Sequence, residues 1–523
     1  MDDVEKKAGL EPDTLATLPD ASSTASGSEQ LKPGGKWDTF QRYNGKLEAA
    51  LGIEARGIER VPETERPDHR LWGNLTLWLS ANCVLPTFGV GILGPLLFDL
   101  GLGDSMLTIF FFVLASATLP AFCSTFGPRL GLRQMTSARF SWGWWGAKGV
   151  ACLNCVACVG WSVANTIGGA QTLSAVGDYK FSAAVGTVIV SLCTLVVGLF
   201  GYKHVHRYEQ YAWIPTAITY LVVLGVAAKH LVNTPMGTGR AEAASVLSFG
   251  GVIWGFVIGW VSLASDYNVY MPADASSAKV FMWTYLGISV PDVLVMWLGA
   301  AIGAAASAGA LPGASETLAN WSAAYADKEL GGLIREVMVP PLHGGGKFFM
   351  VLLVLSVIAN NIINVYSMGM SISVISKYLA YVPRLVWPVV ITAIYIPLAI
   401  VGADRFAATL QDFLSVLGYW LAIFVVVVVE EHFIFRKGNF DNYNAKEAWN
   451  NRALLPMGLA ALASFCFGAA GAAVGMAQVW WIGPLGEKVG GAFGGDIGFE
   501  LASGFTAIVF PIFRYLEIKY TGR

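Results

Sequence analysis

Twelve long apolar runs follow one another along this chain and leave little room for any other kind of structure. Each run is long enough to cross the hydrocarbon core of a bilayer as a helix of roughly 20 residues. The runs cover residues 73–98, 105–127, 150–176, 181–201, 208–232, 247–270, 280–306, 347–372, 384–403, 408–434, 453–478 and 496–516. We therefore predict an all-α polytopic membrane protein with twelve transmembrane helices.

The composition excludes a soluble globular protein. Hydrophobic residues make up 55% of the 523 residues and charged residues only 13%, whereas soluble domains carry about 25% charged residues. The net charge of −2 gives no reason to expect a nucleic-acid partner. The seven cysteines lie in or beside apolar runs, and we interpret them as small packing residues. We expect no disulfide, no metal and no cofactor.

The chain divides into four parts by composition. Residues 1–70 are rich in Ser, Thr, Glu, Lys and Gly and lack a sustained apolar period, so we predict a mostly disordered tail with a short helix near Lys46–Leu51. A ten-helix core is expected over 71–436, two additional transmembrane helices over 437–516, and a short tail over 517–523.

The distribution of Lys and Arg sets the expected orientation. Connections and membrane-flanking ends on the side of both termini carry twenty Lys and Arg residues, and connections on the other side carry eight. Because cytoplasmic connections carry the excess of positive charge, we expect a multi-pass membrane protein with both termini in the cytoplasm. The sequon Asn320-Trp-Ser, in a long loop expected between the seventh and eighth spans, is then external.

Three amides interrupt the eighth apolar run. Asn360, Asn361 and Asn364 are three and four residues apart, so they share one face of a helix. An unpaired amide in hydrocarbon costs roughly 2–7 kcal/mol, so this face must meet protein, water or a polar ligand. A single Asn often bonds two transmembrane helices together. Three on one face favour a binding surface.

The first and sixth runs combine helix-breaking residues with polar ones. In the first, Ser80 and Asn82 precede Pro86, and in the sixth, four glycines precede Trp260 and Ser262. Spans that Gly or Pro interrupts at matching places in two halves indicate a transporter binding site. Because these two spans are five apart, we predict two five-helix repeats of inverted topology. Glycine is also common in membrane helices, so its placement beside polar residues carries the argument.

The third run pairs an aromatic ring with an amide. Trp161 and Asn165 are four residues apart and therefore lie on one helical face. A tryptophan inside a span often only packs against its neighbours. With Asn165 beside it and a second such ring at Trp260, it indicates a slot for a flat ring, because aromatic faces stack on planar heterocycles and amides bond their edges.

Acidic residues inside the spans are few, and each is a functional candidate by default. Asp266 ends the sixth span, Glu209 opens the fifth, and Asp292 lies in the seventh. We select Asp266 and Glu209 as candidates for coupling or gating. Both are expected near the cytoplasmic edge, where a solvated helix end is an equally good interpretation.

Five motifs in order resemble the first type of nucleobase–cation symporters and, within that family, the fungal purine–cytosine permease branch. The motifs are Asn74–Gly91, Gly160–Gln171, Gly259–Tyr267, Asn360–Tyr366, and Leu417–Trp420 leading into Glu430–Arg436. The resemblance covers roughly residues 60–515.

The resemblance implies a LeuT-type fold, a five-plus-five inverted repeat with two extra helices. It implies import of a nucleobase, with adenine, guanine, hypoxanthine and cytosine typical of this branch. The substrate contacts that it implies come from spans one, three, six and eight, and they are Ser80, Asn82, Trp161, Asn165, Trp260, Ser262, Asn360, Asn361 and Asn364.

Two positions depart from the family pattern. Ile363 stands where this branch usually has a proline, which bears on substrate choice because proline would kink the helix. Ile358 and Ala359 stand where sodium-coupled relatives place hydroxyl groups. Since sodium needs several oxygen ligands, we expect protons to be the coupling ion.

We therefore predict a secondary active transporter that imports purines and cytosine by proton symport with alternating access. One alternative is the same fold carrying vitamin B6, allantoin, uracil or a hydantoin. Another is a channel or a substrate sensor that does not transport, although no charged ring or gate pattern indicates a pore. An enzyme is not expected, because no nucleophile–base pair or metal cluster lies inside the spans.

Overall fold

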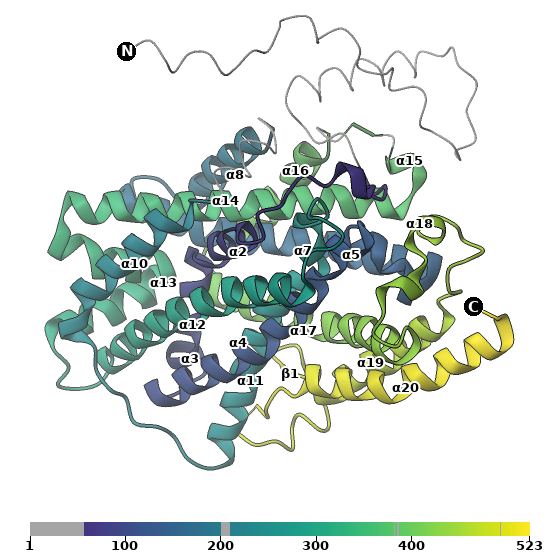
Figure 1. Cartoon of the computed structure of the whole chain (residues 1–523). Helices are drawn as coiled ribbons and strands as arrows, with labels where there is room; N and C mark the ends of the chain where they lie inside the picture. The colour runs from purple at the N-terminus through teal and green to yellow at the C-terminus, as the bar shows by residue number, and fades with distance from the viewer. Residues whose placement is uncertain (1–56, 200–209, 381, 384–385, 492) are drawn as a thin grey trace, which may run out of the picture. The chain divides into compact units, whose positions relative to one another are not determined.

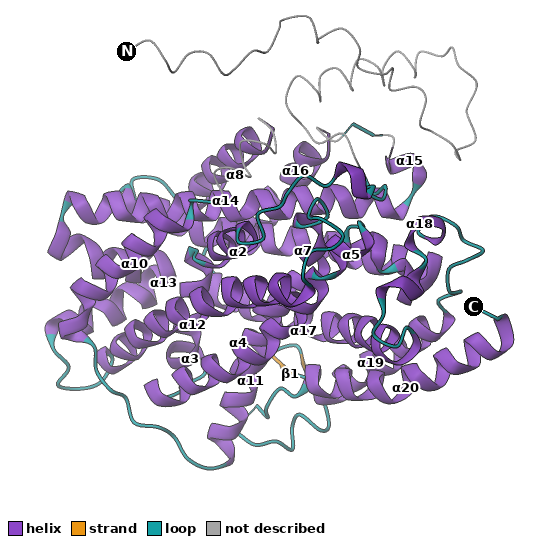
Figure 2. Ribbon diagram, in the orientation of Figure 1, coloured by secondary structure: helices purple, strands orange, loops and turns teal. Residues whose placement is uncertain are grey.

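Helices account for nearly all of the regular structure (Figure 2). The computed structural model describes residues 57–523 apart from 200–209, 381, 384–385 and 492 (Figure 1). The predicted tail helix near Lys46–Leu51 and the candidate acid Glu209 lie outside these described residues.

Eight helices of the described part are long and apolar enough to cross a membrane. A further pair of helices, bent by 52° at the break between them, forms a ninth candidate span. Three shorter apolar helices lie in the remaining predicted runs. The long helices are α4 with α5 (Leu102–Ser124, Phe126–Leu130), α7 (Arg139–Val176), α10 (Trp213–Ala227), α11 (Arg240–Ile258), α12 (Ser277–Gly309), α14 (Gly344–Ile375), α17 (Phe406–Glu430) and α20 (Gly498–Thr521). The bent pair and the shorter helices are α2 (Gly73–Asn82), α3 (Leu85–Leu97), α8 (Ala183–Leu199), α16 (Val386–Val401) and α19 (Leu459–Gly475). The prediction of an all-α polytopic membrane protein is therefore confirmed, with eight or nine candidate spans by length and composition in the described residues. The count of twelve spans includes the three shorter helices and stays a prediction.

Short elements connect these helices. They are η1 (Glu63–Glu65), α6 (Gln134–Ser137), η2 (Ala228–His230), η3 (Gly259–Ser262), η4 (Ala264–Tyr267), α15 (Lys377–Ala380), the π-helical η5 (Glu431–Phe435), η6 (Phe440–Tyr443), α18 (Ala445–Ala448) and the antiparallel strands β1 (Ala477–Gln478) and β2 (Trp481–Ile482). The connection between spans seven and eight, expected to be a loop, is instead the helix α13 (Glu316–Leu342). The sequon residue Asn320 is exposed on this helix.

Both spans that were expected to be broken are broken (Figure 1). Span one changes direction between Asn82 and Leu85, and Pro86 lies in the first turn of the new helix. Backbone N–H groups of the first turn have no partner within the helix, so the missing N–H of proline costs no hydrogen bond there. Span six is α-helical to Ile258 and continues as the 3₁₀ turns η3 and η4. Each break places backbone groups and side chains at the middle of the membrane-spanning region.

Glycine lets the broken spans lie close to their neighbours. A Cβ atom on Gly91 of α3 would come within 2.1 Å of the carbonyl oxygen of Met296 on α12. On Gly255 of α11 it would come within 1.9 Å of the carbonyl oxygen of Leu414 on α17. Any side chain at either position would force the helices apart, so backbone-to-backbone packing sets the positions of both broken spans.

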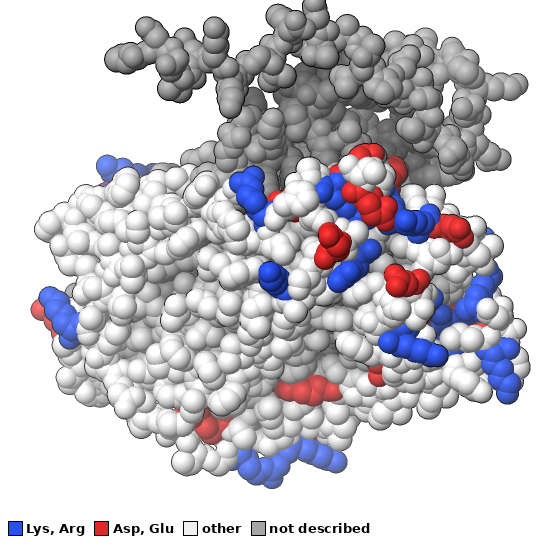
Figure 3. All heavy atoms as spheres, in the orientation of Figure 1, with Lys and Arg blue, Asp and Glu red and all other residues white. Residues whose placement is uncertain are grey.

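The start and the end of the described part of the chain lie at the same end of the helix bundle. Lys446, just before span eleven, forms an ion pair with Glu63 at 3.5 Å, and Arg523 donates to the carbonyl of Arg452 at 3.2 Å. We call this the termini end. In Figure 3 most charged side chains on the visible face gather toward one side, and uncharged surface covers most of the rest.

Candidate functional site

Neighbouring helices satisfy the backbone groups that the break in span one exposes. Tyr220 of α10 donates its hydroxyl to the carbonyl of Val84 at 2.8 Å. The hydroxyl of Ser356 on α14 accepts from the backbone N–H of Leu85 at 3.3 Å. Because lipid cannot bond the polar groups that a break frees, these side chains make the break possible inside a membrane.

Asn82 and Trp260 connect the two breaks. The indole N–H of Trp260 donates to Oδ1 of Asn82 at 2.8 Å, and Nδ2 of Asn82 donates to the carbonyl of Trp78 at 2.9 Å. The rings of Trp78 and Trp260 lie edge to face, with their centroids 5.3 Å apart. The sequence analysis did not select Trp78, although its position one helical turn before Asn82 places it on the same face.

A relay of amides leads from the third span through the eighth to the first. Nδ2 of Asn165 on α7 donates to Oδ1 of Asn360 on α14 at 2.8 Å. Nδ2 of Asn360 in turn donates to the carbonyl of Ala81, just before the break, at 2.6 Å. Both side chains are buried. Three of the four spans that were expected to form the site, namely spans one, three and eight, are therefore joined by hydrogen bonds.

The amide cluster, which we define as Asn165, Asn360, Asn361 and Asn364, has hydrogen-bonding capacity to spare. Three buried atoms lack a partner among the described residues: Oδ1 of Asn165, Oδ1 of Asn361 and Nδ2 of Asn364. Nδ2 of Asn361 reaches only the hydroxyl of Thr166, at 3.5 Å. An unsatisfied buried polar group costs about 1–3 kcal/mol. Two acceptors and one donor are thus available to a polar ligand.

Trp161 approaches span six through a glycine. Its ring lies edge to face with Phe256 of α11 and Phe413 of α17, with centroids 5.4 and 5.3 Å away. A Cβ atom on Gly259 would lie only 2.9 Å from the ring of Trp161. The ring of Trp161 therefore packs against the turn of span six that carries Trp260, so the two predicted aromatic residues lie at the same level.

The two predicted serines bond to backbone groups. The hydroxyl of Ser80 accepts from the backbone N–H of Trp213 on α10 at 3.1 Å. The hydroxyl of Ser262 donates to the carbonyl of Gly259, within its own turn, at 3.1 Å. Neither serine has a hydrogen bond to the amide cluster in the structure, and Ser80 is directed toward α10.

Asp266 lies toward the termini end and is well bonded. Its Oδ1 accepts from the backbone N–H of Gln134 at 2.8 Å, and its Oδ2 accepts from the hydroxyl of Ser367 at 3.3 Å. These two hydrogen bonds fix the orientation of the carboxylate. The structure therefore holds the end of span six against α6 and α14. The other coupling candidate, Glu209, lies outside the described residues.

The eighth span is an uninterrupted helix where a proline was expected. Ile363 is helical, and its carbonyl accepts from the hydroxyl of Tyr267 at 3.3 Å. Ile358 and Ala359 are buried one turn earlier, and neither has a side-chain oxygen. Within the described residues, no three His, Cys, Asp or Glu side chains are close enough together to hold a metal ion.

Comparison with known proteins identifies the family of the chain. A family described as permeases for cytosine/purines, uracil, thiamine and allantoin matches residues 60–483. The purine-cytosine permease fcyB of Emericella nidulans is 43% identical over 91% of each chain. The vitamin B6 transporter TPN1 of Saccharomyces cerevisiae is 31% identical over 91% of this chain and 89% of its own.

The fold has a solved counterpart. Mhp1, a nucleobase-cation-symport-1 family transporter in a closed conformation with bromovinylhydantoin bound, superposes with a TM-score of 0.63 at 14% identity, over 90% of this chain and 96% of its own. The likeness confirms the LeuT-type fold, whose repeats have inverted topology. The chain is a transporter rather than an enzyme, and it belongs to the nucleobase–cation symporter family, in its fungal purine–cytosine permease branch.

Proposed function

We propose that this transporter imports purine nucleobases and cytosine by symport with protons. The observation that carries the proposal is the set of unpartnered buried atoms in the amide cluster, on Asn165, Asn361 and Asn364, beside two broken spans. The proposal is also supported by the relative named as a purine-cytosine permease, at 43% identity.

The open amide atoms suit the edge of a nucleobase. Adenine and cytosine carry an amino donor beside a ring-nitrogen acceptor, and guanine and hypoxanthine carry a carbonyl acceptor beside a ring N–H. Asparagine offers both a carbonyl and an NH₂ group, so one cluster can pair with either pattern. The rings of Trp161 and Trp260 supply the aromatic surface on which a flat base packs. In this proposal Ser80 and Ser262 support the breaks, because both already bond to backbone groups.

Alternating access follows from the position of the breaks. We infer that spans one and six move with their bundle against a scaffold that includes α7 and α14, around a base held at the amide cluster. The hydrogen bonds from Asn360 to Ala81 and from Trp260 to Asn82 link the cluster to both moving spans. A bound base can therefore bias their movement.

Protons are the coupling ion in this proposal. Ile358 and Ala359 place hydrocarbon where sodium-coupled relatives carry hydroxyl groups, which removes two oxygen ligands. Uptake should therefore fall as external pH rises and stay unchanged when sodium is replaced by choline. A requirement for sodium at fixed pH would contradict it.

We further propose a plasma-membrane location with both termini in the cytoplasm. The excess of Lys and Arg on the side of the termini supports this orientation. A cysteine introduced beside the exposed Asn320 should react with an impermeant thiol reagent in intact cells, after any accessible native cysteine has been replaced. Labelling only after permeabilisation would reverse the orientation.

The division into a transport core over 71–436 and two additional helices over 437–516 is part of the same proposal. Arg514 of α20 bonds Glu431 at the end of α17 with its Nε, at 2.8 Å. This contact supports the view that the last helices brace the core rather than contact the substrate.

Transport of vitamin B6 is the second candidate, favoured by the relative TPN1 and by Ile363 at the usual proline position. Radiolabelled adenine uptake in a host without its own carriers separates the two. Excess cytosine should compete with adenine, whereas pyridoxine, allantoin and uracil should not. Competition by pyridoxine alone would select the second candidate, and binding without accumulation would indicate a sensor.

A further inference from the structure

Asp292 is an acid in the middle of α12 that the transport proposal does not use. Its side chain is 0% exposed, and neither carboxylate oxygen has a hydrogen-bond partner in the described part of the chain. No ion pair to a Lys, Arg or His is found for it among those residues either. A buried carboxylate without a partner takes up a proton rather than remain ionised.

Asp292 lies beside the break in span one. Five residues before it, Gly287 packs against Leu75 and Trp78 of α2, and one turn after it, Met296 packs against Gly91 of α3. Along the axis of α12, Asp292 therefore lies at the level of the junction between α2 and α3. Cys83 is buried in that junction.

The helix is weakened where this acid is held. Pro291 directly precedes Asp292 and has no N–H to bond the carbonyl of Gly287. Gly287 is the residue against which span one packs. Movement of span one is thus transmitted to the turn of α12 that carries the acid.

The ionisable groups described on the helices packed against α12 do not neutralise the charge of an ionised Asp292. Neither α2 nor α3 carries a charged side chain, and the hydroxyl of Tyr220 on α10 is bonded to backbone. Asp104 of α4 accepts from the backbone of Gly237, away from the break. Arg335 of α13 pairs at the end opposite the termini. Cys83 is the ionisable neighbour at the break itself.

The other buried acid of the core differs in this respect. Asp266 accepts hydrogen bonds from Gln134 and Ser367. Asp292 receives no such bond from the described residues. Of the two, Asp292 is therefore the acid whose charge no hydrogen bond from the described residues stabilises in this conformation.

We propose that Asp292 is the proton-carrying residue of the transport cycle, which rests on the proposed proton symport. A proton from the external solution forms an O–H bond with one carboxylate oxygen while the break is open to that side. The neutral acid is then buried as span one closes over the base. When the break opens inward, water takes the proton, the carboxylate forms again, and no electron transfer or other reactant is involved.

The test uses the purified full-length protein in liposomes, loaded with a pH-sensitive dye, and radiolabelled adenine. Wild type, Asp292→Asn, Asp292→Glu and the matched control Asp104→Asn, at a buried acid of α4 away from the break, are compared. The measurements are adenine exchange without a gradient, accumulation under an inward proton gradient, and lumen acidification. Asparagine keeps the shape of the protonated acid but cannot release a proton.

Wild type and Asp104→Asn should accumulate adenine about tenfold for one unit of pH gradient and acidify the lumen. Asp292→Asn should keep exchange, lose its pH dependence, and lose accumulation and acidification together. Accumulation by Asp292→Asn equal to wild type would overturn the assignment. So would loss of exchange in both Asp292→Asn and Asp292→Glu, which would mean that the residue only packs. Failure of wild type to couple adenine to protons would instead refute the proposed function.

Discussion

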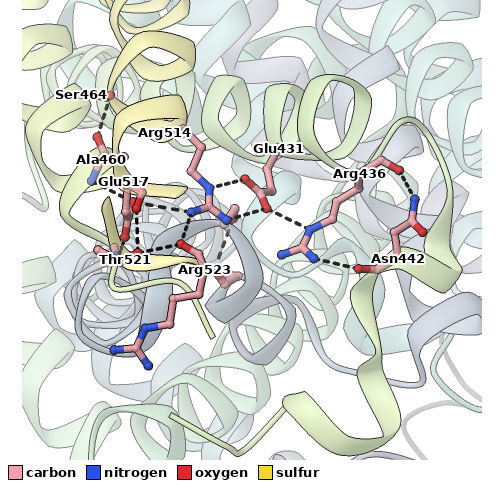
Figure 4. A network of polar contacts seen from close by, with 12 residues as sticks. Glu431, Arg436, Asn442, Ala460, Ser464, Arg514, Glu517, Thr521 and Arg523 are labelled. Atoms are coloured by element: carbon pink, nitrogen blue, oxygen red, sulfur yellow. Dashed lines mark hydrogen bonds and ion pairs between the residues drawn. The ribbon is translucent and has the colours of Figure 1, made fainter. Parts of the chain in front are cut away.

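Two buried polar regions of this molecule have opposite hydrogen-bonding states. At the termini end, Glu431 accepts from Arg514 at 2.8 and 3.2 Å and from Arg436 at 2.9 Å (Figure 4). Glu517 of α20 accepts from the backbone N–H groups of Gly458 and Ala460 at the start of α19. The amide cluster in the core, by contrast, leaves three buried atoms without a partner among the described residues.

The contrast separates a brace from a binding site. The charges of the termini-end network cross from α17 to α20 and are neutralised within the protein, so an added ligand would gain little there. The amides are neutral and incompletely bonded, so a ligand that completes their bonding is stabilised by it. Both regions are buried and polar, so these two properties alone do not distinguish the brace from the binding site.

The largest expected effect comes from breaking the termini-end network. Arg514→Ala leaves the carboxylate of Glu431 buried with only Arg436 beside it, and removing one partner of a buried ion pair costs about 3–5 kcal/mol. We expect a large loss of thermal stability in detergent and of surface protein. Arg436→Ala is the matched control, because Arg436 is partly exposed and its loss keeps the Arg514 bonds. If Arg514→Ala folded normally but changed substrate preference, the brace would be part of the site.

The next largest effect should come from the amide cluster, with the opposite signature. Asn361→Ala and Asn364→Ala should each weaken base recognition by about 1–3 kcal/mol without lowering surface protein. Asn154→Ala is the matched control, because Asn154 also joins α7 to α14, through Ser371 at 2.8 Å. Inhibition constants normalised to surface protein measure the effect. An equal loss in the control would mean that the amides only hold helices together.

Smaller changes are expected from the rings. Trp161→Leu should weaken all bases alike by about 0.5–1.5 kcal/mol, because an aromatic face does not distinguish their edges. Trp161→Phe should be tolerated better than Trp260→Phe, since the latter also removes the donor to Asn82. Binding of several bases to the purified variants measures this, and a base-selective loss in Trp161→Leu would refute the proposed role.

The smallest effect concerns an exposed ion pair at the end opposite the termini. Hydrogen bonds from Lys347 and then Arg335 lower the pKa of Asp178 below its ordinary value. Because the pKa of Asp178 is lower in the folded than in the unfolded protein, its carboxylate stabilises the folded state at pH values above its ordinary pKa. This stabilisation is lost as the pH falls through the pKa of the folded state. Between about pH 5 and pH 3, the melting temperature of wild type should therefore fall slightly more than that of Asp178→Asn. If the melting temperatures of wild type and Asp178→Asn fell equally with pH, the ion pair would be too exposed to contribute to stability.

Much of the fold could be predicted because the membrane permits few solutions. Apolar length indicated the spans, and Pro86 and the glycines before Trp260 indicated both breaks. The helix α13 was missed because its composition does not separate an amphipathic helix from a polar loop. The partners of the broken backbone, Tyr220 and Ser356, required the tertiary structure.

The site was predictable where helical geometry decides and not where packing decides. Spacing placed Asn360, Asn361 and Asn364 together, and the same rule could have separated Ser80 from Asn82. Two residues apart on a helix, their side chains are about 200° apart, so only one of them can face span six. The lack of a hydrogen-bond partner for Asp292 among the described residues, in contrast, depends on which side chains the neighbouring helices place beside it. The sequence alone does not show this arrangement.

The most direct test of the account is an inhibition profile over several purines and pyrimidines for wild type, Asn361→Ala and Asn364→Ala. Uptake of radiolabelled adenine is measured in cells without their own carriers and normalised to surface protein. The account predicts that wild type is inhibited by cytosine, guanine and hypoxanthine, and that each Asn variant changes the ranking of these bases or loses uptake. Profiles identical to wild type in both variants would contradict it.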